Sequence, residues 1–252
     1  MEKYFVEING LLPYAQALGL AWPVEYFFVP TENTCRITSD PIACRHEVSV
    51  HSGVIKNPEA YLCDLVHELC HASLAERIDL AFATIYFSRR YARQSEKAEK
   101  EFAKKYQMLY LAWSHVDIWV DELRHSLFPE LTLADHDSFF QSVSGIASLD
   151  KKTLAGLEAP QHLLALAVHL AETKRFGLVK QDFSKILGCL SRDGQKTVSR
   201  MRQFYEVLPR LTFQKELDVV ALLDSVQKAA NKLGLPIAPQ IIEEESRRVW
   251  LV

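Results

Sequence analysis

Between Pro58 and Pro129 the chain contains neither glycine nor proline, and this feature constrains its fold most strongly. The seventy residues in between are rich in Ala, Leu, Glu, Lys and Arg, which favour helix. Asn57 and Pro58 form a helix start, with Asn as the N-cap and Pro at the first helical position. We therefore predict that this stretch is almost entirely helical, as two or three helices.

Strand character is confined to the first 55 residues. Residues 24–29 form a β-rich run that ends at Pro30, residues 48–54 alternate apolar and polar side chains, and residues 35–38 are a candidate third strand. Beyond Pro129 the pattern stays helical, with candidate helices over residues 160–172, 181–189, 194–207 and 213–233.

These elements predict an α+β fold that is predominantly α-helical. We expect a small N-terminal sheet packed on a central helix, followed by a helical C-terminal half. Residues 1–130 would form the core and residues 131–252 the helical region, because Gly145, Gly156 and Pro160 cluster near this boundary. A single compact domain is equally consistent with the sequence.

The composition excludes several classes of protein. The net charge of −3 provides no basic field for nucleic acid or an anionic membrane. The chain has no apolar run near the roughly 18 residues of a membrane span, and its first residues lack the pattern of a signal peptide. Its five cysteines form no CxxC pair, so we expect free thiols and a cytoplasmic location.

The segment from His67 to His71 reads HELCH, an HExxH motif. Two histidines four residues apart lie one above the other on a helix and can bind one metal ion, while Glu68 is placed to act on a metal-bound water. The surrounding residues 60–75 are almost all apolar, which predicts a buried helix. Burying both imidazoles is costly unless they are satisfied, and one zinc ion would do so. The alternatives are core histidines paired with backbone carbonyls, or an exposed polar stripe.

A catalytic zinc ion takes a third protein ligand and keeps one position for water. Residues 114–125 are the richest source downstream, and on a helical wheel Asp117 borders the apolar stripe, with Asp121 one turn later. We predict Asp117 as the ligand, and Asp121 as the group that orients a zinc-bound histidine. Glu122 and His115 fall away from the stripe and are expected to be solvated. Asp121, Glu122 or a histidine stay open as alternative third ligands.

The motif and the alternating strand before it resemble the core of the zincin metallopeptidases. The spacing from Asp117 to Asp121 is similar to the Glu-xxx-Asp element of the gluzincin branch, in which the first acid binds zinc and the second supports a histidine ligand. This chain departs from that pattern by having Asp as the first acid. The resemblance covers roughly residues 45–125 and implies peptide-bond hydrolysis.

If the resemblance holds, zinc lies on His67, His71 and Asp117, and Glu68 is the general base and then the general acid. An extended peptide would pair with the strand over residues 48–54, which we expect at the sheet edge. Other polar side chains have smaller expected roles: His125 and Tyr110 are candidate donors to the substrate carbonyl, His51 is expected to be a surface residue, and His162 and His169 are expected to be ordinary residues of a helix face.

Two functions follow from these observations. The first is a zinc-dependent metallopeptidase of the cytoplasm, acting on a peptide or protein. The second is a regulatory protein with a zincin fold that binds a partner or peptide without turnover. Neither involves nucleic acid or a membrane, and the sequence does not indicate an oligomeric state.

Overall fold

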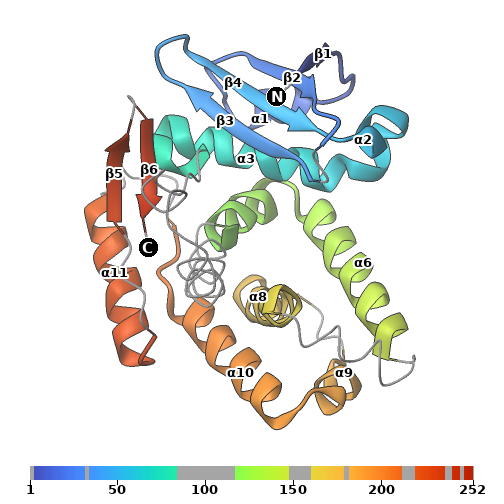
Figure 1. Ribbon diagram of the computed structural model, residues 1–252, viewed down its shortest axis with the longest axis vertical. Helices are drawn as coiled ribbons and strands as arrows, with labels where there is room; N and C mark the ends of the chain where they lie inside the picture. Colours follow the sequence, from blue (N-terminus) through green and yellow to red (C-terminus); the bar gives the residue numbers. More distant parts are fainter. Residues whose placement is uncertain are drawn as a thin grey trace, which may run out of the picture.

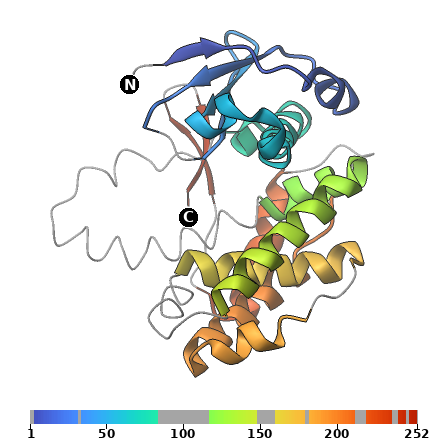
Figure 2. The same ribbon diagram turned by 90° about the vertical axis from the view of Figure 1, so that its right-hand side faces the viewer.

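The structure of the protein is a computed structural model, shown in two orthogonal views in Figures 1 and 2. It describes residues 3–31, 34–83, 117–147, 160–178, 182–211, 219–235, 240–244 and 247–251. Within these ranges the fold is mixed α+β and mostly helical, with a small N-terminal sheet, as predicted.

The N-terminal sheet contains four strands, β1 (Tyr4–Val6), β2 (Val24–Phe28), β3 (Arg36–Asp40) and β4 (Arg45–Val50). Their order in the sheet is β1-β2-β4-β3. The two inner strands, β2 and β4, are parallel, and each outer strand is antiparallel to its neighbour. Alternate residues of β4 are buried, which gives the sheet one face toward the rest of the protein.

The predicted strand over residues 48–54 is wrong in its end and in its position. Strand β4 stops at Val50, and α2 (Ser52–Lys56) follows because the His51 ring accepts a hydrogen bond from the Gly53 N–H and caps this short helix. Strand β4 also lies inside the sheet, between β2 and β3, and the two edge strands are β1 and β3. Periodicity indicates a half-buried strand but carries no information about the order of strands in a sheet.

Helix α3 (Leu62–Arg77) carries the HExxH motif and lies between the sheet and the helical half (Figures 1 and 2). The short 3-10 helix η1 (Pro58–Tyr61) leads into it, and the Asn57 side chain caps η1 as expected. Leu65, Val66, Leu69 and Cys70 are almost completely buried because α3 has a layer on each side. At the other end Glu76 accepts hydrogen bonds from the backbone N–H groups of residues 21 and 22.

The remaining described elements are largely the predicted helices. After η2 (Leu80–Ala83), residues 117–127 are helical, and they are followed by α6 (Pro129–Ala147), α8 (Pro160–Phe176), α9 (Ser184–Cys189), α10 (Arg192–Val207) and α11 (Val219–Lys232). The rest of the predicted long helical stretch, residues 84–116, lies outside the described residues.

The prediction that strands are confined to the first 55 residues is wrong. Strands β5 (Gln240–Glu244) and β6 (Arg247–Leu251) form an antiparallel pair near the C-terminus, beside η2. β-branched and aromatic residues such as Ile241, Ile242, Val249 and Trp250 favour strand there and were the available signal. Helix α1 (Leu12–Ala17) and β1 were also not predicted.

One continuous cluster of buried apolar side chains connects the sheet, α3 and the helical half, from Leu11 to Leu235. The largest fully buried side chain in the described residues is Trp119, whose indole N–H donates to the Pro209 carbonyl oxygen at 2.8 Å. Within the same residues, every helix is too short or too polar to cross a lipid bilayer. The core therefore places α3 and the helix over residues 117–127 against each other.

Candidate metal centre

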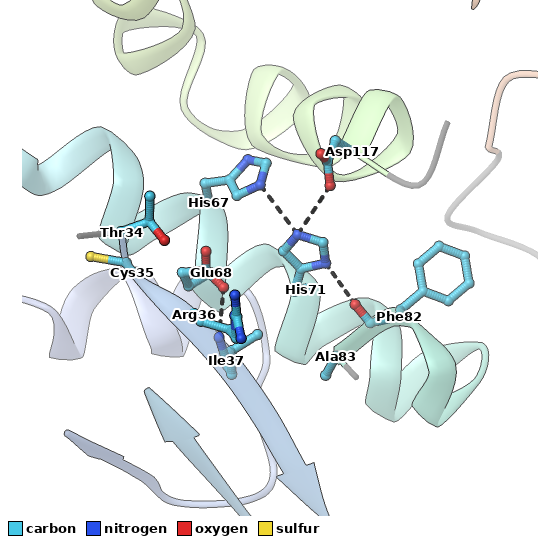
Figure 3. Close-up of a pocket in the computed structure, with 10 residues that line it drawn as sticks. All are labelled: Thr34, Cys35, Arg36, Ile37, His67, Glu68, His71, Phe82, Ala83 and Asp117. Atoms are coloured by element: carbon cyan, nitrogen blue, oxygen red, sulfur yellow. Dashed lines mark hydrogen bonds and ion pairs between the residues drawn. The ribbon is translucent and has the colours of Figure 1, made fainter. Parts of the chain in front are cut away.

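The two histidines of the HExxH motif point toward the same spot, as Figure 3 shows. Their Nε2 atoms are 3.2 Å apart, and the side-chain exposure is 21% for His67 and 8% for His71. The i, i+4 spacing places the rings one turn apart on α3, and the buried surroundings of the helix keep them together.

Hydrogen bonds at the opposite ring nitrogens fix which nitrogen carries the proton. Nδ1 of His71 lies 2.6 Å from the Phe82 carbonyl oxygen, which can only accept, so this nitrogen donates. Nδ1 of His67 lies 2.9 Å from a carboxylate oxygen of Asp121. In the neutral rings both Nε2 atoms therefore carry lone pairs that face each other. Such an arrangement requires a proton or a metal ion between the two nitrogens.

Asp117 supplies a third possible ligand atom. Its Oδ1 is 3.5 Å from His71 Nε2, and the helix over residues 117–127 brings it across from α3 (Figure 3). One ligand atom each from His67, His71 and Asp117 lie within 4.8 Å of one another, so this group could hold a metal ion. Two imidazoles and one carboxylate are a donor set that suits divalent transition metals such as zinc.

Asp121 forms the charged layer behind His67. It accepts a hydrogen bond from the His67 ring and forms an ion pair with Arg124, whose Nη2 is 3.0 Å away. Arg124 in turn contacts Asp135 at 2.6 Å. Burial alone would raise the pKa of Asp121, but Arg124 and His67 hold it well below its usual value. Asp121 is therefore a permanent anion that orients His67 through its Nδ1.

The electrostatics of the pocket attract positive charge. Burial disfavours the charged imidazole of His67, but the surrounding carboxylates, Asp121 foremost, outweigh it and raise its pKa to about 9. A bound metal ion would take the place of the proton that the metal-free site holds on His67. The donor set and the charge of this site thus fit a divalent cation.

Glu68 lies in the same pocket and is held by the edge strand. Its Oε2 accepts a hydrogen bond of 2.8 Å from the Ile37 N–H of β3. The pocket has a volume of about 200 Å³, and residues 34–37 of the strand side face the histidines across it (Figure 3). Burial, and then the charges of Glu68 and Asp64, raise the pKa of Cys35 there to about 12. Cys35 is therefore a thiol, which is a poor nucleophile.

Glu122, the alternative ligand, was predicted to be solvated, and this prediction is wrong. Glu122 is buried, and its two oxygens accept hydrogen bonds of 3.1 and 3.2 Å from Arg175 on α8. The wheel correctly placed Glu122 away from the Asp117 side of the helix, but a second layer of protein covers that side as well. Glu122 does not reach the histidines of the motif.

The other predicted site residues are more distant from the motif or cannot be placed. The ring of His125 stacks on Phe176, with ring centroids 4.7 Å apart, instead of lining the pocket of the HExxH histidines. His51 caps α2 and packs edge-on against Tyr61. Tyr110 and His115 lie outside the described residues.

The structure contains a second group of possible metal ligands that was not predicted from the sequence. His169, which was expected to be an ordinary residue of a helix face, comes together with His136 and Glu172. His136 comes from α6 and is far in sequence from His169 and Glu172, which come from α8. The i, i+3 spacing of His169 and Glu172 on one helix was the only local signal.

Comparison with known proteins leaves the site to be judged on its own geometry, since no family model, curated protein or solved structure matches the chain.

Proposed function

We propose that the protein is a zinc-dependent metallopeptidase, with zinc on His67, His71 and Asp117. The observation that carries this proposal is the pair of Nε2 atoms, which converge to 3.2 Å because both Nδ1 atoms donate elsewhere. Asp121, which accepts a hydrogen bond from Nδ1 of His67, would orient this ligand. When bound, zinc lowers the pKa of a coordinated water toward neutrality and polarises a carbonyl group.

The residues of the chain supply the proton transfers. Glu68 follows His67 directly and shares its pocket. We assign it the role of general base, taking a proton from the water that attacks the peptide carbonyl carbon. As the C–N bond breaks, Glu68 returns this proton to the leaving amine. The hydrogen bond from the Ile37 N–H fixes one carboxylate oxygen, which leaves the other for the reaction.

The edge position of β3 supports a peptide as the substrate. The strand next to the pocket is β3 and not the segment predicted from the sequence, and only one of its sides is paired within the described sheet. An extended peptide could add to the other side by backbone hydrogen bonds and so pass Glu68. We keep the cytoplasm as the proposed location, with neither nucleic acid nor a membrane as a partner.

The decisive experiment combines metal analysis with a matched pair of variants. Purified protein is expected to hold zinc and to cleave peptides in a proteome-derived library, with cleavage read by mass spectrometry. Glu68→Gln should keep the zinc and slow cleavage about 10²–10⁴-fold, since it removes the general base. Glu59→Gln, an exposed residue on η1, is the control and should change neither quantity.

Three results would count against the proposal. Less than about 0.2 zinc per chain after metal-replete expression would exclude a zinc enzyme. Undiminished cleavage by Glu68→Gln would remove Glu68 from the mechanism. Full zinc occupancy without cleavage of any library peptide would favour the regulatory alternative, a zincin-fold protein that binds a partner without turnover.

A further inference from the structure

The second group of possible ligands lies between α6 and α8, within the helical half. His136 comes from α6, and His169 and Glu172 come from α8. Figure 2 shows these two helices crossing each other below α3. This group, the α6–α8 cluster, is distinct from the HExxH site and has no part in the proposed peptidase mechanism.

The α6–α8 cluster is compact and enclosed. Nε2 of His136 is 2.8 Å from a Glu172 oxygen, and the rings of His136 and His169 have centroids 4.8 Å apart. Phe139 stacks on the His169 ring at a centroid distance of 3.7 Å. His136 is 5% exposed and Glu172 1% exposed. One ligand atom from each of the three residues lies within 4.8 Å of the others.

The hydrogen bonds of the α6–α8 cluster are incomplete. Nδ1 of His169 donates to the Ala165 carbonyl oxygen at 2.9 Å, so its Nε2 carries a lone pair. This Nε2 is buried, and no described residue donates a hydrogen bond to it. Oε1 of Glu172 receives no hydrogen bond from a described donor, although a protonated Glu172 can itself donate to Asp121. Buried acceptors without a partner are costly, so the cluster calls for a donor or a cation.

Negative charge accumulates beside the cluster, and either a proton or a cation would neutralise it. Burial, and after it the negative charge of Asp121, raise the pKa of Glu172 well above its usual value. A proton on Glu172 would relieve this repulsion but would still leave Nε2 of His169 without a partner. Burial lowers the pKa of both His136 and His169, so the rings are neutral and available as ligands. A divalent ion would satisfy the two imidazoles and the carboxylate together.

We propose that His136, His169 and Glu172 form a second metal site that binds one divalent transition-metal ion of the zinc class. Two imidazoles and a carboxylate match the ligand preferences of this class. His136 and Glu172 are buried and His169 is half-buried, which suits a structural ion, and binding would cross-link α6 to α8. The ion would also neutralise Glu172 next to Asp121, the residue that orients His67.

The test uses the full chain and zinc alone as the probe. Chelator-treated protein is titrated with Zn²⁺, and bound metal is counted by elemental analysis after gel filtration. The wild type is expected to bind about two ions per chain, and the double variant His67→Ala/His71→Ala about one. In that double variant, added Zn²⁺ should raise the melting temperature, because ligand binding to the folded state stabilises it. Adding His169→Asn should abolish both the bound ion and the shift.

His162→Ala, an exposed residue on the same helix, is the matched control and should keep the second ion. The stoichiometry of the wild type is independent of whether any variant folds, which far-UV circular dichroism would check. One ion in the wild type and none in His67→Ala/His71→Ala would overturn the second site and leave the proposed peptidase intact. One ion in the wild type that is retained in His67→Ala/His71→Ala would overturn the HExxH site and leave the second site intact.

Discussion

The HExxH site and the α6–α8 cluster use the same kinds of ligand in different surroundings. The HExxH site opens into a pocket, whereas His136 and Glu172 are almost completely enclosed. In the HExxH site the Nδ1 atoms of the two histidines are held by a carboxylate and a carbonyl, and the carboxylate of Glu68 lines the same pocket. The identity of the ligand residues alone therefore does not indicate catalysis. Access to a pocket and a neighbouring Glu68 distinguish the two sites.

Asp121 connects the two sites, because it accepts from His67 on one side and interacts with Glu172 on the other. The next residue, Glu122, is a buried carboxylate that has hydrogen-bond partners within the protein. It accepts hydrogen bonds from Arg175 and from the Leu211 N–H, so it needs no metal ion. The HExxH site, the α6–α8 cluster and Glu122 therefore differ in which of their buried groups have partners within the protein.

The largest expected effect comes from Arg175→Met. This change leaves the Glu122 carboxylate buried without its partner, which costs about 3–5 kcal/mol in the free energy of unfolding. Lys174→Met removes the neighbouring exposed ion pair with Glu206 and should cost below about 1 kcal/mol. Urea denaturation measures both, and zinc stoichiometry should not change in either variant. Equal stabilities for the two variants would show that Glu122 is not satisfied by Arg175.

An intermediate effect is expected from Asp121→Asn. The substitution removes the negative charge that orients His67, so the zinc affinity of the HExxH site should fall about 10–100-fold. Competition with a chromophoric chelator gives the affinity. Asp117→Ala, which removes a proposed ligand, should have a larger effect than Asp121→Asn. Asp64→Asn, in the adjoining pocket near His67, is the control for a general loss of charge. If Asp121→Asn lowers the zinc affinity more than Asp117→Ala does, Asp121 is the ligand and Asp117 the orienting residue.

Local spacing explains how much of the site could be predicted. His67 and His71 are one turn apart on a single helix, and Asp117 and Asp121 are one turn apart on another, so helical geometry alone oriented both pairs correctly. That these two helices face each other depends on packing, which the sequence indicated only through a resemblance. The roles of Asp117 and Asp121 stay predictions.

Long-range partners explain what could not be predicted. Glu122 was expected to be solvated because it falls away from the apolar stripe of its helix, and its partner, Arg175, comes 53 residues later on α8. His136 and Glu172 are 36 residues apart and meet only when α6 packs on α8. In the same way, periodicity identified the strands near residues 24 and 48 but not that β4 would be inside the sheet and β3 at its edge. Helical and strand periods describe one element, whereas these contacts join two.

His46 provides the reference for both proposed metal sites, because it is a buried histidine whose two ring nitrogens are both satisfied. Nδ1 lies 2.7 Å from the Ser39 hydroxyl and Nε2 lies 2.8 Å from Glu76, while Trp22 stacks on the ring. His46→Gln should therefore leave zinc stoichiometry unchanged. Retention of both ions would support the distinction between satisfied and unsatisfied histidines, and loss of an ion would contradict it.

The same variant should produce the smallest effect, on the pH dependence of stability. Burial lowers the pKa of His46 below 6.5, against the opposing hydrogen bond and charge of Glu76. Below pH 6.5 the unfolded chain therefore binds a proton that the folded chain does not, so His46 lowers the stability of the wild type as the pH falls. In His46→Gln the free energy of unfolding should decrease less between pH 7.5 and 5.5. His162→Gln is the exposed control, and a slope in His46→Gln as steep as in the wild type would mean that the pKa of His46 is the same in the folded and unfolded protein.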